Sequence, residues 1–216
     1  VEGRNVCGIH FTNGDAFAVA SVMNCEGKEL AVRYFKGGKE YTHRCSKVLE
    51  KIEKSRKSRG ENAGGRVNQK YWMHLKHLGE QYAHQVSLNI VTFCKEQDVS
   101  VIAFPQYDEE YRRHVLKGAG NFGTLNLSTR IREYLTYKAW KEGILVLDVN
   151  AKEMHRICAV CGSEIAQQDK QSKRFVCEKG HQSDAYLNVA RNAAKRCQEQ
   201  FRKKVRKEKN VSAKKS

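Results

Sequence analysis

The chain has 216 residues, and its 40 Lys and Arg against 24 Asp and Glu give a formal net charge of +16. A surplus of this size favours a polyanionic partner, above all the phosphate backbone of a nucleic acid. No apolar run approaches the roughly 20 residues that span a membrane, and no signal peptide opens the chain. We therefore expect a soluble, cytoplasmic protein with no membrane partner and one sizeable core.

Short apolar runs alternate with turn signals at the start of the chain. Strands are predicted at roughly 6–11, 16–24 and 29–35, because Asn13-Gly14 and Glu26-Gly27 separate the runs. The pattern indicates three antiparallel strands.

A strongly basic stretch follows at 42–60 and has a thin apolar stripe at Val48, Leu49 and Ile52. It predicts a helix with a positive face, which either is only solvated or contacts nucleic acid. A flexible connector is predicted at 61–66. The candidate nucleic-acid contacts in and after this stretch are Lys51, Lys54, Arg56, Lys57, Arg59, Arg66 and Lys70, with Arg112 and Arg113 as weaker candidates.

Residues 67–97 carry apolar side chains at helical spacing, which favours core packing over base stacking. The expected core positions of this helix are Trp72, Leu75, Leu78, Gly79, Tyr82, Ala83, Val86, Ile90 and Phe93. The continuous apolar run at 99–104 then predicts a buried parallel strand.

The segment 106–123 has no clear period and several glycines, so a loop-rich insertion is expected. A helix is predicted from Asn126 or Ser128 to Gly143, followed by another buried strand at 144–149. From residue 202 onward the sequence is basic and is expected to be disordered.

A metal-binding spacing occupies the C-terminal third of the chain. Cys158 and Cys161 are separated by two residues, and Cys177 and His181 follow after a spacer of hairpin length. Three thiolates and one imidazole suit zinc, and four protein ligands leave no position for a catalytic water. We therefore predict a structural zinc site.

A helix should begin directly after this zinc motif, because Asp184 is a favoured N-cap and good helix formers follow it. The zinc motif, followed at once by Asp184, Asn188, Ala193 and Ala194, resembles the third RuvC motif of TnpB transposon nucleases and type V CRISPR effectors. The resemblance implies that Asp184 is a metal-binding catalytic residue, whereas the residues alone require only a helix cap.

The order of the predicted elements is similar to an RNase H-like (RuvC) α/β fold, with a mixed sheet flanked by helices and an inserted zinc ribbon. We expect the first part of the RuvC domain at 1–154, the ribbon at 155–183, the final RuvC helix at 184–201 and a basic tail at 202–216.

The family's hydrolytic chemistry needs carboxylates from several elements around two divalent ions. The resemblance implies that the first acid is replaced by His10 and the second by Pro105, or at best by Gln106. Imidazole is a poor magnesium ligand, and proline offers no side-chain ligand. Asp15 and the acidic cluster at 108–110 lie several residues from the expected positions, so compensation by them is not favoured.

The favoured hypothesis is therefore a nuclease-inactive, RNA-guided DNA-binding component with guide RNA and DNA as partners. One alternative is an active TnpB-type endonuclease, which would require magnesium. The other alternative is a zinc-stabilised structural subunit with non-specific nucleic-acid binding. Because the relatives carry a further N-terminal lobe, a second protein chain that supplies it is also considered.

Overall fold

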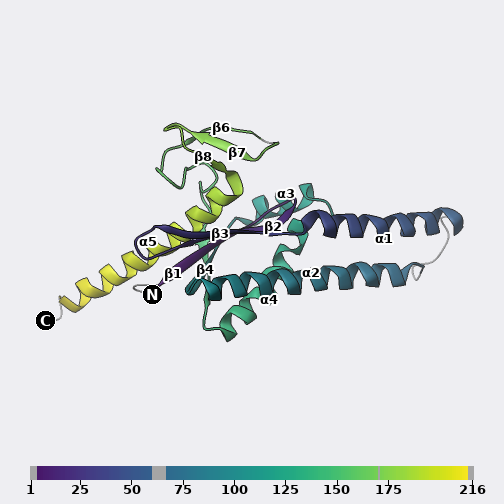
Figure 1. The fold of residues 1–216 in the computed structure, drawn as a ribbon, viewed down its shortest axis with the longest axis horizontal. Coiled ribbons are helices and arrows are strands. Elements are labelled where there is room, and N and C mark those ends of the chain that lie inside the picture. Colours follow the sequence, from purple (N-terminus) through teal and green to yellow (C-terminus); the bar gives the residue numbers. More distant parts are fainter. Residues whose placement is uncertain (1–3, 60–66, 170, 214–216) are drawn as a thin grey trace.

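A five-stranded mixed sheet and a smaller three-stranded sheet organise the computed structural model, which describes residues 4–59, 67–169 and 171–213 (Figure 1). The large sheet has the order β3-β2-β1-β4-β5, and the small one has the order β6-β7-β8. The strands of the large sheet are β1 (Asn5–Phe11), β2 (Ala16–Met23), β3 (Glu29–Lys36), β4 (Val99–Gln106) and β5 (Leu145–Asn150). The helices are α1 (Gly38–Arg59), α2 (Gln69–Glu96), α3 (Glu109–Gly118), α4 (Ser128–Lys141) and α5 (Ala185–Ala213), with a short 3-10 turn at Thr124–Leu127. This arrangement confirms the predicted α/β class.

The first three strands form the expected antiparallel meander, and β1 pairs on its other side with β4 in parallel. Alternate residues of β1 therefore face opposite layers. Cys7 and Ile9 belong to the core beneath α1, α2 and α4, whereas Val6 packs in the core beneath α5. Gly8 and His10 share the α5 side of the strand.

Helices α1 and α2 form a long hairpin that extends well beyond the sheet (Figure 1). Most of the predicted core positions of α2 are buried, but Trp72 is 48% exposed, so its assignment to the core is wrong. Trp72 lies in the first turn of α2, which the sheet does not cover. The helical spacing predicts which face of α2 is buried, but it does not predict how far along the helix the core extends.

Strand β5 is at the edge of the large sheet and pairs with β4. Leu145 is half exposed, and only Val149 of the strand is fully buried. The prediction of a buried strand is therefore correct in type and wrong in burial, because an apolar run does not distinguish a central strand from an edge strand. Helix α4 has the predicted buried positions Ile131, Leu135 and Ala139.

The segment predicted to be loop-rich contains helix α3. The Asp108 carboxylate accepts the backbone N–H of Tyr111 at 2.7 Å, which caps the helix, and Glu109 and Glu110 occupy the favourable first turn. No residue of α3 is fully buried. The absence of a core-facing stripe explains why hydrophobic periodicity missed this helix.

Helix α5 lies across the face of the large sheet opposite α1, α2 and α4, and it continues to Ala213. The disorder predicted from residue 202 is wrong up to that point, because the basic stretch consists largely of good helix formers. No helix in the described part of the chain combines the length and apolarity needed to cross a bilayer.

The closest approach of α5 to the sheet is at Gly8. A Cβ atom at this position would lie 1.9 Å from the carbonyl oxygen of Ala190 and 2.7 Å from the backbone nitrogen of Ala194. Both neighbours are backbone atoms of α5, so a larger residue could be accommodated only if the whole helix moved. Gly8 therefore sets the distance between β1 and α5.

We expect Gly8→Ala to lower the free energy of unfolding by about 2 kcal/mol or more, since overpacking against backbone is costly. The measurement is denaturant unfolding. Gly118→Ala is the matched control, because a Cβ atom there would meet nothing within 4 Å, and it should be neutral or slightly stabilising. Equal stabilities of the two variants would contradict the close approach.

Candidate metal site and nucleic-acid cavity

The four predicted zinc ligands lie together in the ribbon formed by β6 (Ile165–Gln168), β7 (Arg174–Cys177) and β8 (Gln182–Asp184). Their ligand atoms are all within 4.8 Å of one another. The Sγ atoms of Cys161 and Cys177 are 3.7 Å apart, and Cys177 Sγ is 3.5 Å from Nδ1 of His181. A tetrahedron with Zn–S bonds of about 2.3 Å has S···S edges of about 3.8 Å. The cluster therefore fits a metal ion such as zinc.

Two tight turns bring the ligands into this arrangement. The Gly162 N–H donates to the Cys158 carbonyl, and the Gly180 N–H donates to the Cys177 carbonyl. Both glycines have positive φ angles, 76° and 81°, which residues with a Cβ atom adopt at a cost. Hydrogen bonds from Ser163 lower the pKa of the Cys161 thiol to about 6, which favours the thiolate that binds zinc.

Two asparagines of α5 fasten the first turn of the ribbon to the helix. The Asn188 Oδ1 atom accepts the Ala159 N–H at 2.7 Å, and its Nδ2 donates to the Ile157 carbonyl at 2.8 Å. Asn192 Nδ2 donates to the carbonyls of Met154 and Ile157, both at 2.9 Å. Both side chains are buried. The Asn residues that follow the zinc motif therefore join the ribbon to the RuvC-like core.

A second link joins α5 to the edge of the sheet. Arg191 makes a two-pronged ion pair with Glu29 of β3, with distances of 2.7 and 2.6 Å, and also donates to Ser183 of β8. Burial raises the pKa of Glu29, but the hydrogen bonds from Arg191 and Ser21 outweigh it and lower the pKa overall. The start of α5 is thus fixed against both sheets.

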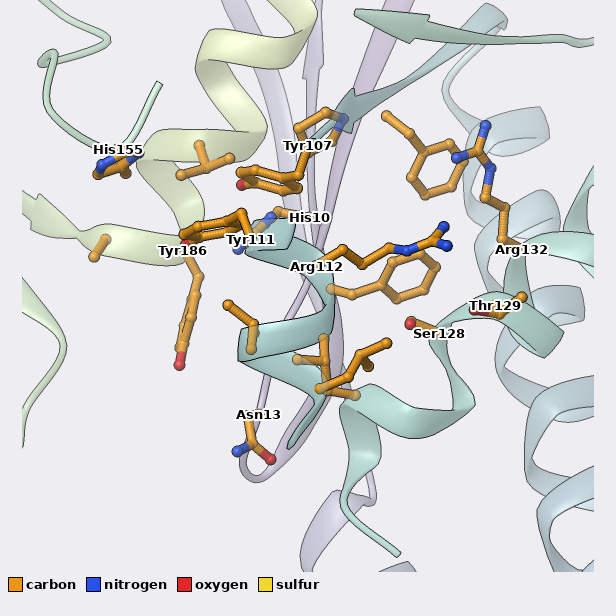
Figure 2. Close-up of a pocket in the computed structure, with 18 of the residues that line it drawn as sticks. His10, Asn13, Tyr107, Tyr111, Arg112, Ser128, Thr129, Arg132, His155 and Tyr186 are labelled. Atoms are coloured by element: carbon orange, nitrogen blue, oxygen red, sulfur yellow. The ribbon is translucent and has the colours of Figure 1, made fainter. Parts of the chain in front are cut away.

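A cavity of about 670 Å³ opens where the C-terminal ends of β1 and β4 meet α3, α4 and α5 (Figure 2). Its walls include His10 and Pro105, the two positions at which the RuvC resemblance led us to expect lost acids. Tyr186 of α5 also lines the cavity, and its ring centroid is 5.6 Å from that of His10. The remaining aromatic and basic residues of the wall are Phe11, Phe104, Tyr107, Tyr111, Arg112, Arg132 and His155.

Asp184 is not among the residues that line this cavity. Its Oδ1 atom accepts the Leu187 N–H at 2.8 Å, which is the N-cap interaction that the sequence alone required. Burial and the neighbouring Asp184 carboxylate raise the pKa of Tyr34, on β3, to about 12, which places Asp184 next to β3. The residues that follow it, Ala185 and Tyr186, line the cavity together with His10 and Pro105, and the role of Asp184 as a metal-binding residue stays a prediction.

Sequence reasoning missed Tyr186 as a cavity residue. The signal was available, because Tyr186, Val189 and Ala193 recur at helical spacing and share the sheet-facing side of α5. Asp15 does not line the cavity, and Asp108 caps α3, so neither proposed substitute acid faces His10. Among the described residues, Glu133 is the one acidic residue in the wall.

The polar groups of the cavity are largely uncharged at neutral pH. Burial lowers the pKa of His10 to about 4, so its imidazole is neutral. Burial also raises the pKa of Tyr107 and of Tyr186, so both hydroxyls keep their protons. The wall next to β1 therefore offers aromatic faces and neutral donors in place of anionic ligands.

The candidate nucleic-acid contacts on α1 are solvent-exposed, namely Lys51, Lys54, Arg56 and Lys57, and so is Lys70 at the start of α2. Lys57 pairs with Glu53 at 2.8 Å on the same helix. The side chain of Arg59 and the whole of Arg66 lie outside the described residues, as does the connector predicted at 61–66.

A comparison with protein-family models finds a match in the C-terminal part of the chain. Residues 129–193, from α4 through the ribbon to the first third of α5, match the family model described as Cas12f1-like, TNB domain. Over these residues the chain is similar to the TNB domain of Cas12f1-like proteins. The search of curated proteins found no match.

Three solved structures share the fold of this chain. A Cas12f1–sgRNA–target DNA complex matches with a TM-score of 0.69 and 13% identity over 88% of this chain and 49% of that one. A CRISPR-Cas12f ternary complex gives 0.68 and 16% over 88% and 38%. An AacC2c1–sgRNA–extended non-target DNA complex gives 0.54 and 13% over 80% and 23%. The chain thus spans less than half the length of each of these effectors.

We expect purified protein to hold one tightly bound zinc ion per chain, as measured by elemental analysis. Cys158→Ser should lose the metal and destabilise the ribbon, because metal affinity contributes to folding. Cys25→Ser is the matched control, since Cys25 is an exposed free cysteine outside the cluster. Metal-free wild-type protein with unchanged thermal stability would exclude a structural zinc site.

We also expect an acid-dependent loss of stability that originates at His10. Its pKa is about 6.5 when unfolded and about 4 when folded, so the unfolded chain binds the extra proton between these values. Stability is therefore complete above pH 6.5 and falls by up to about 3 kcal/mol as the pH drops to 4.

The measurement is urea unfolding of the wild type and of His10→Gln at several pH values. The loss of stability from Glu29 occurs in both proteins, so the difference in slope isolates His10. Parallel pH profiles would show that His10 is not held neutral in the folded protein.

Proposed function

We propose that this chain is the RuvC-like part of an RNA-guided DNA-binding protein and that it binds nucleic acid without cleaving it. The observation that carries the proposal is the composition of the cavity at the ends of β1, β4 and α5. The wall of the cavity at these ends carries His10, Pro105 and Tyr186, with the His10 and Tyr186 rings 5.6 Å apart. Two-metal phosphodiester hydrolysis needs carboxylates at such a junction.

None of these three side chains can replace a carboxylate as a magnesium ligand. Magnesium is a hard cation that prefers oxygen ligands, which disfavours the neutral imidazole of His10. Pro105 has no ligand atom in its side chain. The hydroxyl of Tyr186 stays protonated because burial raises its pKa. The single lining acid, Glu133, could supply one ligand, and one ligand does not form a two-metal site.

The binding half of the proposal rests on charge and on the relatives. The net charge of +16 favours phosphate backbones, and α1 carries exposed cations at Lys51, Lys54, Arg56 and Lys57, of which Lys57 is paired with Glu53. The matching effectors were solved with sgRNA and DNA. We infer that guide RNA and DNA are partners of this chain and that its cations contact their backbones. The participation of a second protein chain stays a prediction.

The decisive experiment combines sequencing of co-purifying nucleic acid with a cleavage assay in magnesium and in manganese. We expect a defined RNA and no cleavage. Asp184→Ala should leave RNA binding intact and lower the free energy of unfolding by about 1 kcal/mol, since it removes a helix cap. Asp108→Ala is the matched control, because it removes the cap of α3 in the same way.

Cleavage that disappears in Asp184→Ala and persists in Asp108→Ala would contradict the proposal and establish an active endonuclease. Binding that weakens steeply with salt and ignores RNA identity would instead favour the zinc-stabilised structural subunit.

A further inference from the structure

We propose that the cavity between α3 and α5 binds one unpaired nucleotide of a single strand, with the base stacked on Tyr111 and the phosphate held by Arg112. This inference rests on the proposed function, because a cavity that assembled catalytic metals would contact a strand through its scissile phosphate. It adds a specific contact to what would otherwise be binding by surface charge.

Three rings at the mouth of the cavity form a platform for stacking. Tyr107 and Tyr111 are stacked at 4.9 Å with planes 26° apart, and Tyr111 is near-parallel to His155, at 6.4 Å and 17°. Tyr107 follows the end of β4, Tyr111 belongs to α3, and His155 precedes the first strand of the ribbon. Tyr111 is 42% exposed, and His155 is also exposed. The exposed parts of Tyr111 and His155 are therefore available to a base, and every base can use them because stacking is sequence-tolerant.

The platform separates two hollows. Tyr107, Tyr111 and His155 line the main cavity and also a second hollow beside β5. A single strand that crosses this platform would keep one base on the rings, and its flanking phosphates would enter the hollows on either side. Arg112 lines the first hollow, and Lys152 and Arg156 line the second. Each hollow thus has at least one cation in its wall, and Asp108 and Glu153 also line the second hollow.

Arg112 is the cation available to a ligand in the main cavity. Figure 2 shows its side chain extending from α3 across the hollow toward α4. Arg132, on the opposite wall, is held by two bonds of 2.6 and 2.7 Å to Asp148 and stacks over Phe104. Among the described residues no acidic side chain is within ion-pair distance of Arg112, whereas Arg113 pairs with Glu109 at 3.4 Å. Charge complementarity therefore favours an anionic ligand such as a nucleotide.

The interior of the cavity combines a largely apolar wall with a few neutral hydrogen-bonding groups, which suits an aromatic base. Tyr107 and Tyr186 keep their hydroxyl protons, and His10 is neutral, so all three can form hydrogen bonds without adding charge. The volume of about 670 Å³ lies within the range of about 300–1,000 Å³ typical of small-molecule sites. An unpaired nucleotide fits this site because its base can stack on the rings, its phosphate can pair with Arg112, and the cavity has room for it.

The test measures affinities of the full-length protein for fluorescent 12-mers by anisotropy at fixed salt. The probes are oligo(dT), oligo(U), a 12-mer duplex and an abasic strand with the same number of phosphates. Tyr111→Ala should weaken binding of the base-bearing single strand by at least about fivefold, the lower end of what stacking contributes, and leave the abasic strand unaffected. Arg112→Ala should weaken both single strands. Comparing the loss of affinity for oligo(dT) with the loss for oligo(U) identifies whether the cavity receives DNA or RNA.

Two matched controls come from the chain itself. Tyr137→Ala removes an equally exposed tyrosine on α4, outside the cavity, and Arg113→Ala removes the paired neighbour of Arg112. Because α3 has no buried residue, these α3 variants should fold, which the zinc content and the melting temperature verify.

The inference fails if Tyr111→Ala and Arg112→Ala bind single strands as tightly as their controls do. It also fails if Tyr111→Ala weakens the abasic strand or the duplex as much as the base-bearing strand. Either result leaves the proposed function intact, since surface cations could still bind nucleic acid. Metal-dependent cleavage would overturn the proposed function whatever the stacking result.

Discussion

The close contact between Gly8 of β1 and the backbone of α5 is the constraint on which the rest of the molecule depends. With no Cβ atom in between, the carbonyl of Ala190 lies directly over the strand. Small residues of α5, including Ala193 and Ala194, continue this contact toward the second core. The helix is therefore held at one depth and in one rotational position across the sheet, and that position determines which side chains face the cavity.

The same helix couples the metal site to the sheet. Asn188 and Asn192 satisfy backbone groups of the first zinc turn, while Arg191 forms its ion pair with Glu29. Buried amides that meet all their partners define one geometry, because any displacement leaves a buried polar group unpaired. The ribbon is consequently joined to the large sheet through α5.

The cavity brings together aromatic rings, a proline and a neutral imidazole at the ends of β1 and β4. These groups carry no charge at neutral pH and need no cation to balance them. Such a junction is cheaper to desolvate than a cluster of carboxylates, since burying unpaired charge is strongly unfavourable. The resulting hollow is suited to flat, neutral rings and to a phosphate at its basic edge.

The sequence by itself determined the features that depend on local spacing. The four zinc ligands, the three-strand meander and the apolar faces of α2 and α4 follow from turn residues and hydrophobic periods within a short stretch of chain. Only the tertiary structure decided which residue of α5 faces His10. The Tyr186 ring is 5.6 Å from that of His10, whereas Asp184 precedes the helix and accepts the Leu187 N–H as its cap. The exposure of Trp72 and of β5, and the platform on α3, likewise depend on where other elements end, which no local pattern records.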